Sequence, residues 1–333
     1  MTELIRLADV TRDPPADKCP AERWRSLRGG AVAVGNFDGV HRGHQSLLRH
    51  LREQADACGG PAVAVSFDPH PAAVLRPADL PPPLTTMAER ARRMSHHGVD
   101  ALIVLRTTRC LLDLDAETFY RVLFEDRLAA QSIVEGPNFF FGRDRAGDVV
   151  KLDQWCRRDG RTMFVVHPTE DDGEMISSSR IRNAVAGGDM RAVRKMSGWP
   201  HRVDGIVIHG NRRGRTIGFP TANLANVETV LPAPGVYAGL VDGLNQQTHC
   251  AAVHIGPVPT FGDVQGTRVE VHVIGFDGDL YGHRIGVDLY RRLRGVEKFD
   301  SAEALVQQMR TDVSRATKMM DDIRAALTPP KRQ

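Results

Sequence analysis

A pair of histidines, His41 and His44, lies in the segment of this 333-residue chain that is richest in chemistry. The segment reads Gly35-Asn36-Phe37-Asp38-Gly39-Val40-His41-Arg42-Gly43-His44. It follows an apolar run at 31–34, which predicts a buried strand, and leads into 45–58, where apolar residues recur at helical spacing. A helix N-terminus offers unpaired N–H groups, and two imidazoles three positions apart can share one face. The pattern therefore predicts a phosphate site.

Two further polar loops follow apolar runs. Asp68 and His70 come after the run 61–67, and the prolines beside them keep both residues out of a helix. Asn138 and Phe139 stand in a later loop with three consecutive aromatic residues. Because three adjacent aromatics cannot all face one core, at least one is expected to line a pocket. The carboxyl ends of parallel strands meet at one edge, so these loops could converge with the histidines.

A serine- and arginine-rich segment opens a predicted helix further along the chain. It reads Ile176-Ser177-Ser178-Ser179-Arg180-Ile181-Arg182. Serines before a helix are common N-caps, which is a sufficient structural explanation for them. Together with the two arginines, they also form a compact set of donors for a triphosphate.

A glycine- and arginine-rich loop stands in the second half of the chain. It runs His209-Gly210-Asn211-Arg212-Arg213-Gly214-Arg215-Thr216-Ile217-Gly218-Phe219-Pro220-Thr221-Ala222-Asn223-Leu224. Such a loop can present backbone N–H groups to phosphate, and the oxygens of Thr221 and Asn223 suit a phosphate-bound Mg²⁺. A surface hairpin with an Asx turn is the alternative. Glu270, in the alternating run 269–273, is either a solvent-facing strand residue or a carboxylate able to accept a hydroxyl proton.

The elements that must position these residues differ between the two halves. In the first half, predicted strands alternate with predicted helices, which indicates a parallel, doubly wound sheet. The strands are expected at 31–34, 61–67, 100–105, 131–135 and 162–167. Thr86 with Glu89, Asp115 and the start of 148–158 are expected to open helices.

The second half has short strands separated by turn residues, which favours a small antiparallel barrel. The strands are expected at 203–208, 236–241, 249–255 and 269–274. A helix is predicted over 302–327, with Asp300 and Glu303 as its cap.

These motifs, taken together and in order over about 31–312, resemble bacterial FAD synthetases, the bifunctional riboflavin kinase/FMN adenylyltransferases. The resemblance implies an α/β fold. A Rossmann-like, doubly wound nucleotidyltransferase domain at 1–190 would precede a small antiparallel β-barrel riboflavin kinase domain at 200–328 with a C-terminal helix. Riboflavin and FMN would be the substrates, with ATP and Mg²⁺.

The resemblance also implies roles for residues. His41, His44 and Glu270 would be catalytic. ATP in the adenylyltransferase would contact Gly35, Asn36, Phe37, Asp38, Gly39, Ser177, Ser178, Ser179, Arg180 and Arg182, and its flavin would contact Asp68, His70, Asn138 and Phe139. ATP in the kinase would contact Gly210, Gly214, Arg215, Gly218, Pro220, Thr221 and Asn223, of which Thr221 and Asn223 would also hold the metal.

Some positions depart from the family pattern. Phe140 replaces a residue that is usually polar, His254 replaces an asparagine, and Gly275 replaces an aspartate. The last two lie near the expected riboflavin site. Two alternatives therefore stay open. One is another nucleotidyltransferase. The other is a protein of the same family with an impaired kinase half, acting as a flavin-binding or regulatory protein.

Composition narrows the class of protein further. The 44 basic and 41 acidic residues give a net charge of +3 without a basic block, so nucleic acid is not an expected partner. No apolar run approaches the roughly 20 residues that span a bilayer, and the N-terminus lacks a signal-peptide core. Five scattered cysteines fit the reducing cytoplasm. Small molecules are the expected partners, and self-association is left open.

Overall fold

The structure, a computed structural model, describes residues 1–7, 21–210, 217–244, 247–257 and 267–327. Contacts divide the chain into two compact units, Met1–Pro81 with Thr85–Ser177 and Pro82–Leu84 with Ser178–Gln333. The helices α8 (Ser178–Gly187) and α9 (Met190–Ser197) are grouped with the second unit. The domain boundaries at 190 and 200 stay a prediction.

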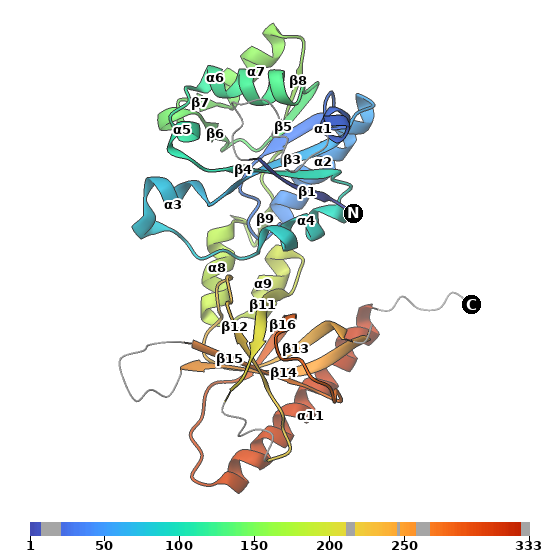
Figure 1. The fold of residues 1–333 in the computed structure, drawn as a ribbon, viewed down its shortest axis with the longest axis vertical. Coiled ribbons are helices and arrows are strands. Elements are labelled where there is room, and N and C mark those ends of the chain that lie inside the picture. The colour runs from blue at the N-terminus through green and yellow to red at the C-terminus, as the bar shows by residue number, and fades with distance from the viewer. Residues whose placement is uncertain (8–20, 211–216, 245–246, 258–266, 328–333) are drawn as a thin grey trace, which may run out of the picture. The chain divides into compact units, whose positions relative to one another are not determined.

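Six parallel strands form the sheet of the first unit (Figure 1). They are β1 (Glu3–Leu7), β2 (Ala31–Val34), β3 (Ala62–Asp68), β4 (Ala101–Arg106), β5 (Ser132–Glu135) and β8 (Thr162–Val165). Their order is β1-β4-β3-β2-β5-β8, so the chain proceeds from β2 in one direction and then returns to its other side. The reversal between β2 and β5 is the point where ligands bind in such sheets.

Helices cover both faces of this sheet, because its strand residues alternate between two hydrophobic clusters. Val32 and Val34 pack in one cluster, while Ala31 and Ala33 pack in the other. The first cluster includes residues of α1 (Ala21–Ser26), α5 (Arg109–Leu112), α6 (Ala116–Tyr120), the π-helix η2 (Arg121–Arg127) and α7 (Val149–Arg158). The second includes residues of α2 (Arg42–Ala57) and α4 (Met87–Ser95). The predicted doubly wound sheet is confirmed.

Shorter elements complete the first unit. They are α3 (Pro71–Leu75), the 3-10 helices η1 (Pro77–Asp79) and η3 (Arg143–Arg145), and two hairpins, β6 (Phe140–Phe141) with β7 (Gly147–Asp148) and β9 (Glu170–Asp171) with β10 (Glu174–Met175). The predicted helix caps are confirmed, since Thr86 Oγ1 accepts the Glu89 N–H at 3.2 Å and Asp115 Oδ1 accepts the Thr118 N–H at 2.9 Å. The strand β1 was not predicted.

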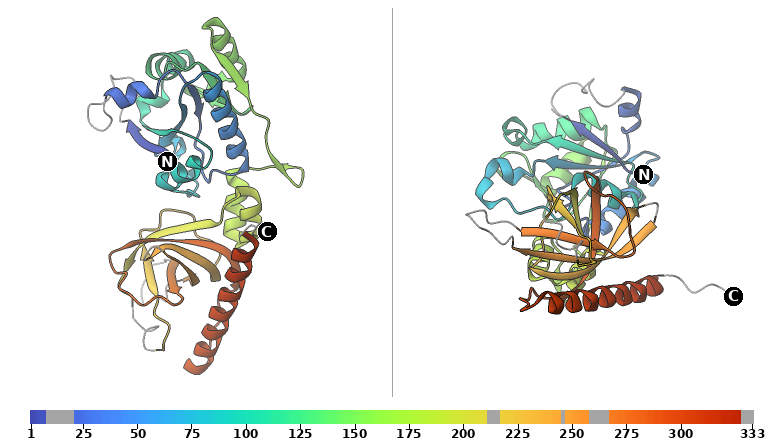
Figure 2. Two further views of the ribbon diagram at one scale, coloured as in Figure 1. Left: turned by 90° about the vertical axis from the view of Figure 1, so that its right-hand side faces the viewer. Right: turned by 60° about the horizontal axis from the view of Figure 1, so that its bottom comes forward.

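The second unit contains a closed, six-stranded antiparallel barrel in the order β11-β12-β15-β14-β13-β16. Its strands are β11 (His201–Ile208), β12 (Ala222–Ala225), β13 (Gly235–Leu244), β14 (Gln247–Pro257), β15 (Thr267–Val273) and β16 (Arg284–Arg294). The barrel confirms the predicted fold, although β12 and β16 were not predicted. Helix α11 (Ala302–Leu327) lies along its outside, against β13 and β14 (Figure 2).

The predicted cap of α11 is wrong in its first residue. Ser301, rather than Asp300, precedes the helix, and its Oγ accepts the Ala304 N–H at 3.1 Å. A serine hydroxyl next to the first helical residue reaches this N–H directly, which places the cap one position later than the sequence pattern suggested.

A buried carboxyl group bridges the two strands at the reversal of the sheet. Glu135, at the end of β5, is 1% exposed, and its Oε1 accepts the Val34 N–H at the end of β2 at 2.7 Å. The two strands pair only through Ala31 with Ser132 and Val32 with Ile133, so the side chain extends their contact toward the carboxyl edge. Burial raises the pKa of Glu135 well above its usual value, so its carboxyl group stays protonated and uncharged to a higher pH than an exposed glutamate.

Glu135 is expected to make the stability of the first unit depend on pH. The unfolded chain ionises this group above a pH of about 4.5, whereas the folded state keeps it protonated, so unfolding releases a proton. The contribution of this group to the free energy of unfolding is therefore fully present below that pH. As the pH rises, the free energy of unfolding falls by up to about 1.4 kcal/mol per pH unit until the raised pKa of the folded state is reached. Glu135→Gln keeps the acceptor and should stabilise the unit more at pH 8 than at pH 5.

Urea unfolding can be followed by fluorescence in a Trp199→Phe background, where the remaining tryptophans, Trp24 and Trp155, both lie in the first unit. Glu53→Gln, at an exposed position of α2, is the matched control and should leave the pH dependence unchanged. An equal effect of Glu135→Gln at both pH values would contradict the buried neutral acid.

Candidate active site

The loop between β2 and α2 has an unusual backbone. Phe37 and Val40 have φ values of +50° and +43°, a region that side chains with a Cβ rarely occupy, and Val40 is β-branched. Both residues are buried in the cluster that α2 and α4 cover. The ring of Phe37 also packs edge-on against His44, with 5.4 Å between the ring centroids. Packing under the loop therefore helps to fix its conformation.

A buried ion pair holds the same loop. Arg90 Nη2 on α4 donates to Asp38 Oδ1 at 2.9 Å, and their side chains are only 7% and 4% exposed. Arg90 Nη1 also donates to the Asn36 carbonyl at 2.8 Å, while Thr85 donates to Asp38 from both its backbone N–H and its hydroxyl at 3.1 Å. The carboxylate of Asp38 is thus occupied with holding the loop, and its predicted contact with ATP stays a prediction.

The two histidines are brought together at the start of α2. Their rings are stacked, with centroids 3.6 Å apart and planes at 17°, and His41 Nδ1 accepts the His44 N–H at 3.4 Å. Gly43 leaves room for this stacking, because a Cβ there would lie 3.2 Å from the His41 ring, a tight contact. Spacing alone predicted that the imidazoles share a face, and the structure confirms it.

His44 is electrically neutral at neutral pH in this arrangement. Burial lowers its pKa well below the usual value, and electrostatic interactions with His41 and Arg90 lower it further. Its Nδ1 is buried and has no hydrogen-bond partner within the described residues. A buried, unpaired ring nitrogen beside a helix N-terminus is suited to an anionic oxygen that supplies the missing partner.

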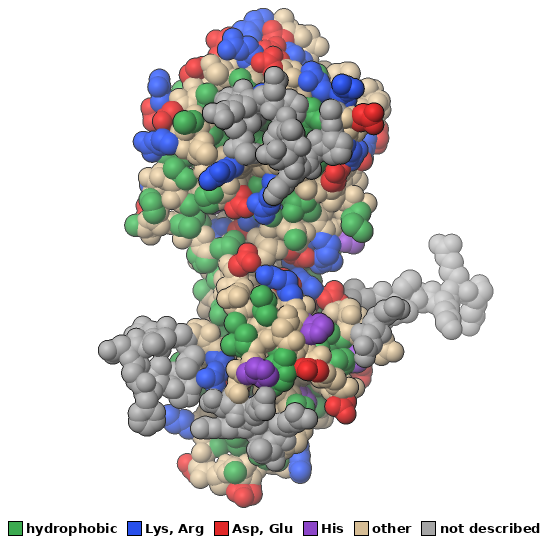
Figure 3. Space-filling model, in the orientation of Figure 1, with side chains coloured by type: hydrophobic (Ala, Val, Ile, Leu, Met, Phe, Trp, Pro, Cys, Tyr) green, Lys and Arg blue, Asp and Glu red, His purple; other side chains and the backbone are tan. Residues whose placement is uncertain are grey.

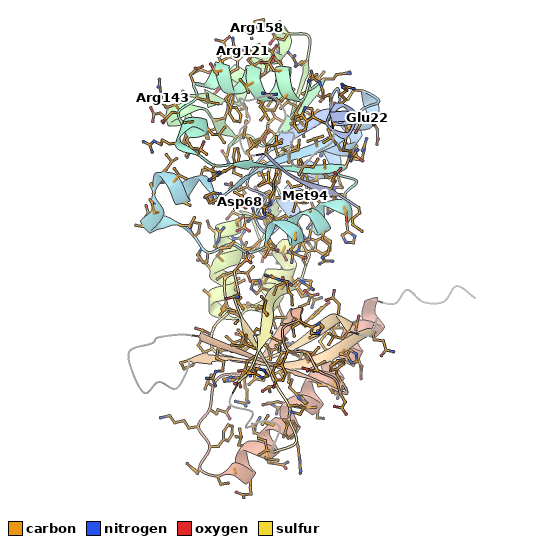
Figure 4. The ribbon with its side chains drawn as sticks, in the orientation of Figure 1. Glu22, Asp68, Met94, Arg121, Arg143 and Arg158 are labelled. Carbon is orange, nitrogen blue, oxygen red and sulfur yellow. The ribbon has the colours of Figure 1, made fainter. Side chains whose placement is uncertain are left out.

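The loop after β3 contacts this site through His70. His70 Nε2 lies 2.9 Å from Asn36 Nδ2, and His70 Nδ1 accepts the Ala72 N–H as the N-cap of α3. Asp68, labelled in Figure 4, forms a partly exposed ion pair with Arg6 of β1 instead. The structure therefore brings His70 to the loop of the histidine pair, while Asp68 pairs toward the sheet edge.

The aromatic segment after β5 splits between core and surface. Phe141 is buried, and Phe139 stacks on it with centroids 5.2 Å apart. Phe140 is 43% exposed, and the guanidinium of Arg145 lies 4.3 Å from its ring centroid. Asn138 is exposed, with its amide nitrogen 4.0 Å from the sulfur of Met175. Contact of Asn138 and Phe139 with a flavin stays a prediction.

The serine–arginine segment starts α8. Ser177 ends the first unit, whereas Ser178, Ser179, Arg180 and Arg182 belong to the second by their contacts. Arg182 Nε donates to the Pro82 carbonyl at 2.8 Å. The helical placement of the segment is confirmed, and its binding of ATP stays a prediction.

In the barrel, strand register aligns several of the predicted residues in one row. Glu270 of β15 pairs with Asn223 of β12 on one side and with His254 of β14 on the other. The amide of Asn223 lies against Gly210, where a Cβ would approach its Nδ2 to 2.2 Å, so a larger residue at 210 would displace this amide. Arg268 Nη1 donates to Glu270 Oε1 at 3.4 Å. The row places a side-chain amide, a carboxylate and an imidazole on neighbouring strands.

A cavity of about 450 Å³ lies in the second unit, and the barrel residues Ala222, Val271 and Val273 line it, whereas the three residues of the row do not. Pro220 and Thr221 line it, together with Asp277, Asp279 and Tyr281 from the loop that precedes β16. Gly218 has a φ of +84°, which glycine adopts without strain. Gly275, in the turn after β15, has a similar conformation, with a φ of +72°. Gly214 and Arg215 lie outside the described residues.

The described surface and side chains show mixed charge and free thiols. On the face drawn in Figure 3, basic and acidic side chains are interspersed over each unit. Across the described ranges, no group of three or more His, Cys, Asp or Glu side chains is arranged to hold a metal ion. Among those same residues, no helix is long and apolar enough to cross a bilayer. The described cysteines, Cys58, Cys110, Cys156 and Cys250, are free thiols.

Arg90 is the residue of the site that the sequence analysis did not find. Its signal was present, because Arg90 stands beside Ala91 and close to Met94, both on the buried face of α4. A charged residue on an apolar helix face needs a buried partner. Its partner, Asp38, is 52 positions away, and pattern alone does not connect the two.

Comparison with known proteins agrees with both units. The model of the FAD synthetase family matches residues 24–180, and the riboflavin kinase model matches 197–320. The bifunctional riboflavin kinase/FMN adenylyltransferase of Pseudomonas fluorescens is 36% identical over 87% of this chain and 92% of its own length. The enzyme of the same name from Escherichia coli K12 is 34% identical, over 85% and 90% of the two chains.

A solved structure is similar over nearly the whole chain as well. The crystal structure described as a macrolide-efflux protein from Streptococcus pneumoniae has 32% identity and a TM-score of 0.82, over 94% of this chain and 98% of that one. The matches to the bifunctional enzymes extend across both units at more than 30% identity. The chain belongs to the family of bifunctional riboflavin kinase/FMN adenylyltransferases.

Proposed function

We propose that this chain converts riboflavin to FMN in its second unit and FMN to FAD in its first, with ATP as the second substrate of both steps. The observation that carries the proposal is that each unit has its own polar site inside the segment that matches the corresponding enzyme family. The histidine pair lies in one, and the row of Asn223, Glu270 and His254 lies in the other. A cytoplasmic location is inferred from the free thiols.

For the kinase step, Glu270 accepts the proton of the ribityl hydroxyl as its oxygen attacks the γ-phosphorus of ATP. The bond from the γ-phosphorus to the bridging oxygen breaks, and ADP leaves. Glu270 is 27% exposed at its side chain, so a substrate can reach it. Pro220 and Thr221, which line the cavity and directly precede β12, are suited to hold the nucleotide.

For the adenylyl step, an oxygen of the FMN phosphate attacks the α-phosphorus of ATP, and pyrophosphate leaves. The phosphate is already anionic, so the step needs positioning and charge stabilisation more than a base. His41 and His44 lie at the N-terminus of α2, where N–H groups and the helix dipole favour a polyphosphate. Negative charge from ATP would favour protonation of His44 and strengthen the hydrogen bond that its ring donates to the bound phosphate.

The residues present fit a Mg²⁺ ion that is bound largely through the nucleotide. Thr221 and Asn223 supply two neutral oxygens, and Glu270 lies across from Asn223. Such an ion commonly takes only one or two protein ligands and fills its other positions with phosphate and water. When bound, it would neutralise charge on the transferred phosphoryl group.

The alternatives differ in what they leave unexplained. Another type of nucleotidyltransferase would not account for the barrel or for its match to the riboflavin kinase family. An impaired kinase half would follow if His254 and Gly275 disabled the barrel site. Yet Gly275 forms a tight turn in open space, and His254 stands beside Glu270 without covering it.

Substitution should separate the two activities. We expect Glu270→Ala to lower riboflavin phosphorylation by about 100-fold or more, since a general base typically contributes that much, while FMN adenylylation continues. The double change His41→Ala with His44→Ala should do the reverse. Chromatography of riboflavin, FMN and FAD after incubation with Mg²⁺ and ATP measures both reactions.

Glu297→Ala, at an exposed position after β16, is the control for the barrel variant and should retain both activities. Loss of both reactions in a folded Glu270→Ala protein would contradict separate sites. Failure of the unchanged chain to phosphorylate riboflavin, while it still makes FAD from FMN, would support the impaired kinase half.

Removal of Mg²⁺ should stop both reactions. With excess EDTA, we expect no FMN from riboflavin and no FAD from FMN, and added Mg²⁺ should restore both. Thr221→Val, which keeps the size but removes the oxygen, should raise the Mg²⁺ concentration needed for the kinase step only. An equal effect of Thr221→Val on adenylylation would contradict a metal-binding role confined to the barrel.

A further inference from the structure

His254 faces the proposed catalytic carboxylate on the barrel wall. The two residues are directly paired across β14 and β15, and His254 Nδ1 lies 3.9 Å from Glu270 Oε2. Their side chains are 39% and 27% exposed, so both are within reach of a substrate. This distance is too long for a hydrogen bond, but a movement of about 1 Å would form one.

The surroundings of the imidazole hold it in this place. Gly256 lies beneath the ring, and a Cβ there would come within 2.9 Å of Cε1 and 3.0 Å of Nε2. Although the side chain as a whole is partly exposed, its Nδ1 is buried and has no hydrogen-bond partner among the described residues. The carboxylate of Glu270 faces this nitrogen across the wall, 3.9 Å away. A buried donor without a partner costs free energy, which a bond to Glu270 would recover.

The imidazole is also in the protonation state that can donate without adding a charge. Burial lowers the pKa of His254. Glu270 opposes this shift, and the positive charges of Arg294 and Arg268 add to it. A neutral imidazole carries one N–H, which can be placed on Nδ1. A neutral donor fixes a carboxylate while reducing its basicity less than a second cation would.

The two oxygens of Glu270 face different partners. Arg268 donates to Oε1 at 3.4 Å, while Oε2 faces His254. With Arg268 as its only hydrogen-bond donor among the described residues, the carboxylate can rotate about its last bond. A second donor at Oε2 would fix its plane, and each oxygen would keep a lone pair free for a hydroxyl proton.

We propose that His254 is a positioning residue of the kinase reaction, whose Nδ1–H donates to Glu270 Oε2 when the substrates bind and thereby orients the carboxylate toward the ribityl hydroxyl. This inference rests on the proposed role of Glu270 as the base. Hydrogen bonds of this kind are often long in the free enzyme and tighten in the complex. The effect should therefore appear in the rate of the bound complex more than in binding.

Three variants of the full chain test this role. His254→Leu removes the donor, His254→Gln moves it one bond farther from the backbone, and His254→Asn keeps an N–H at the same number of bonds as Nδ1. We expect the leucine and glutamine variants to lower kcat for riboflavin phosphorylation by about 10- to 100-fold, with KM for riboflavin and ATP within about twofold. The asparagine variant should recover kcat to within about threefold of the unchanged chain.

His96→Asn is the matched control, because His96 is an exposed histidine at the C-cap of α4, in the first unit. It should leave kcat unchanged, and adenylylation of FMN should continue in every variant, which reports an intact first unit. The glutamine variant tests the proposal should the leucine variant fail to fold.

The proposal is overturned if leucine or glutamine leaves kcat unchanged, if the loss falls entirely in KM, or if asparagine fails to restore kcat. Glu270→Gln separates this failure from that of the proposed function. If Glu270→Gln still phosphorylates riboflavin, Glu270 is not the base and the proposed mechanism fails with it. If Glu270→Gln is inactive while the His254 variants keep their kcat, the positioning role alone fails.

Discussion

The ion pair between Arg90 and Asp38 is the interaction on which the first site depends. Both charges are withdrawn from water, which is costly unless every donor and acceptor is engaged. Arg90 and Thr85 meet this requirement by binding Asp38 together, while Arg90 also binds the backbone of Asn36. A pair assembled in this way tolerates little displacement, because each lost bond would leave a buried charge incompletely solvated. It therefore imposes one conformation on the loop between β2 and α2.

That conformation carries local backbone strain, and the strained turn positions the two histidines. Phe37 and Val40 occupy backbone angles that persist only where surrounding structure enforces them. The enforced turn delivers His41 to the N-cap of α2, and the helix then sets His44 against it. The barrel site is built by another rule. Its row of side chains is fixed by strand register, since a slip by one residue would turn Glu270 into the barrel interior.

Much of this arrangement could be predicted from the sequence where the signal is local. Apolar runs located the central strands, and capping residues located helix starts such as Thr86 and Asp115. Alternation placed Glu270 on the outward face of its strand. Two of the strands that were missed lack a long apolar run. β12 has only four residues, one of them Asn223, and β16 carries several arginines and an aspartate. Pairing between distant charges, as in Asp38 with Arg90, has no local pattern.

The two hydrophobic clusters that sandwich the parallel sheet and the cluster beneath α11 draw their residues from separate units. Each unit thus has an interior sufficient to define its own cooperative transition. For such a chain, one melting temperature is an incomplete description. Heat or denaturant can inactivate one catalyst while its neighbour on the same polypeptide keeps turning over, so the yield of a single product does not measure how much intact protein is present.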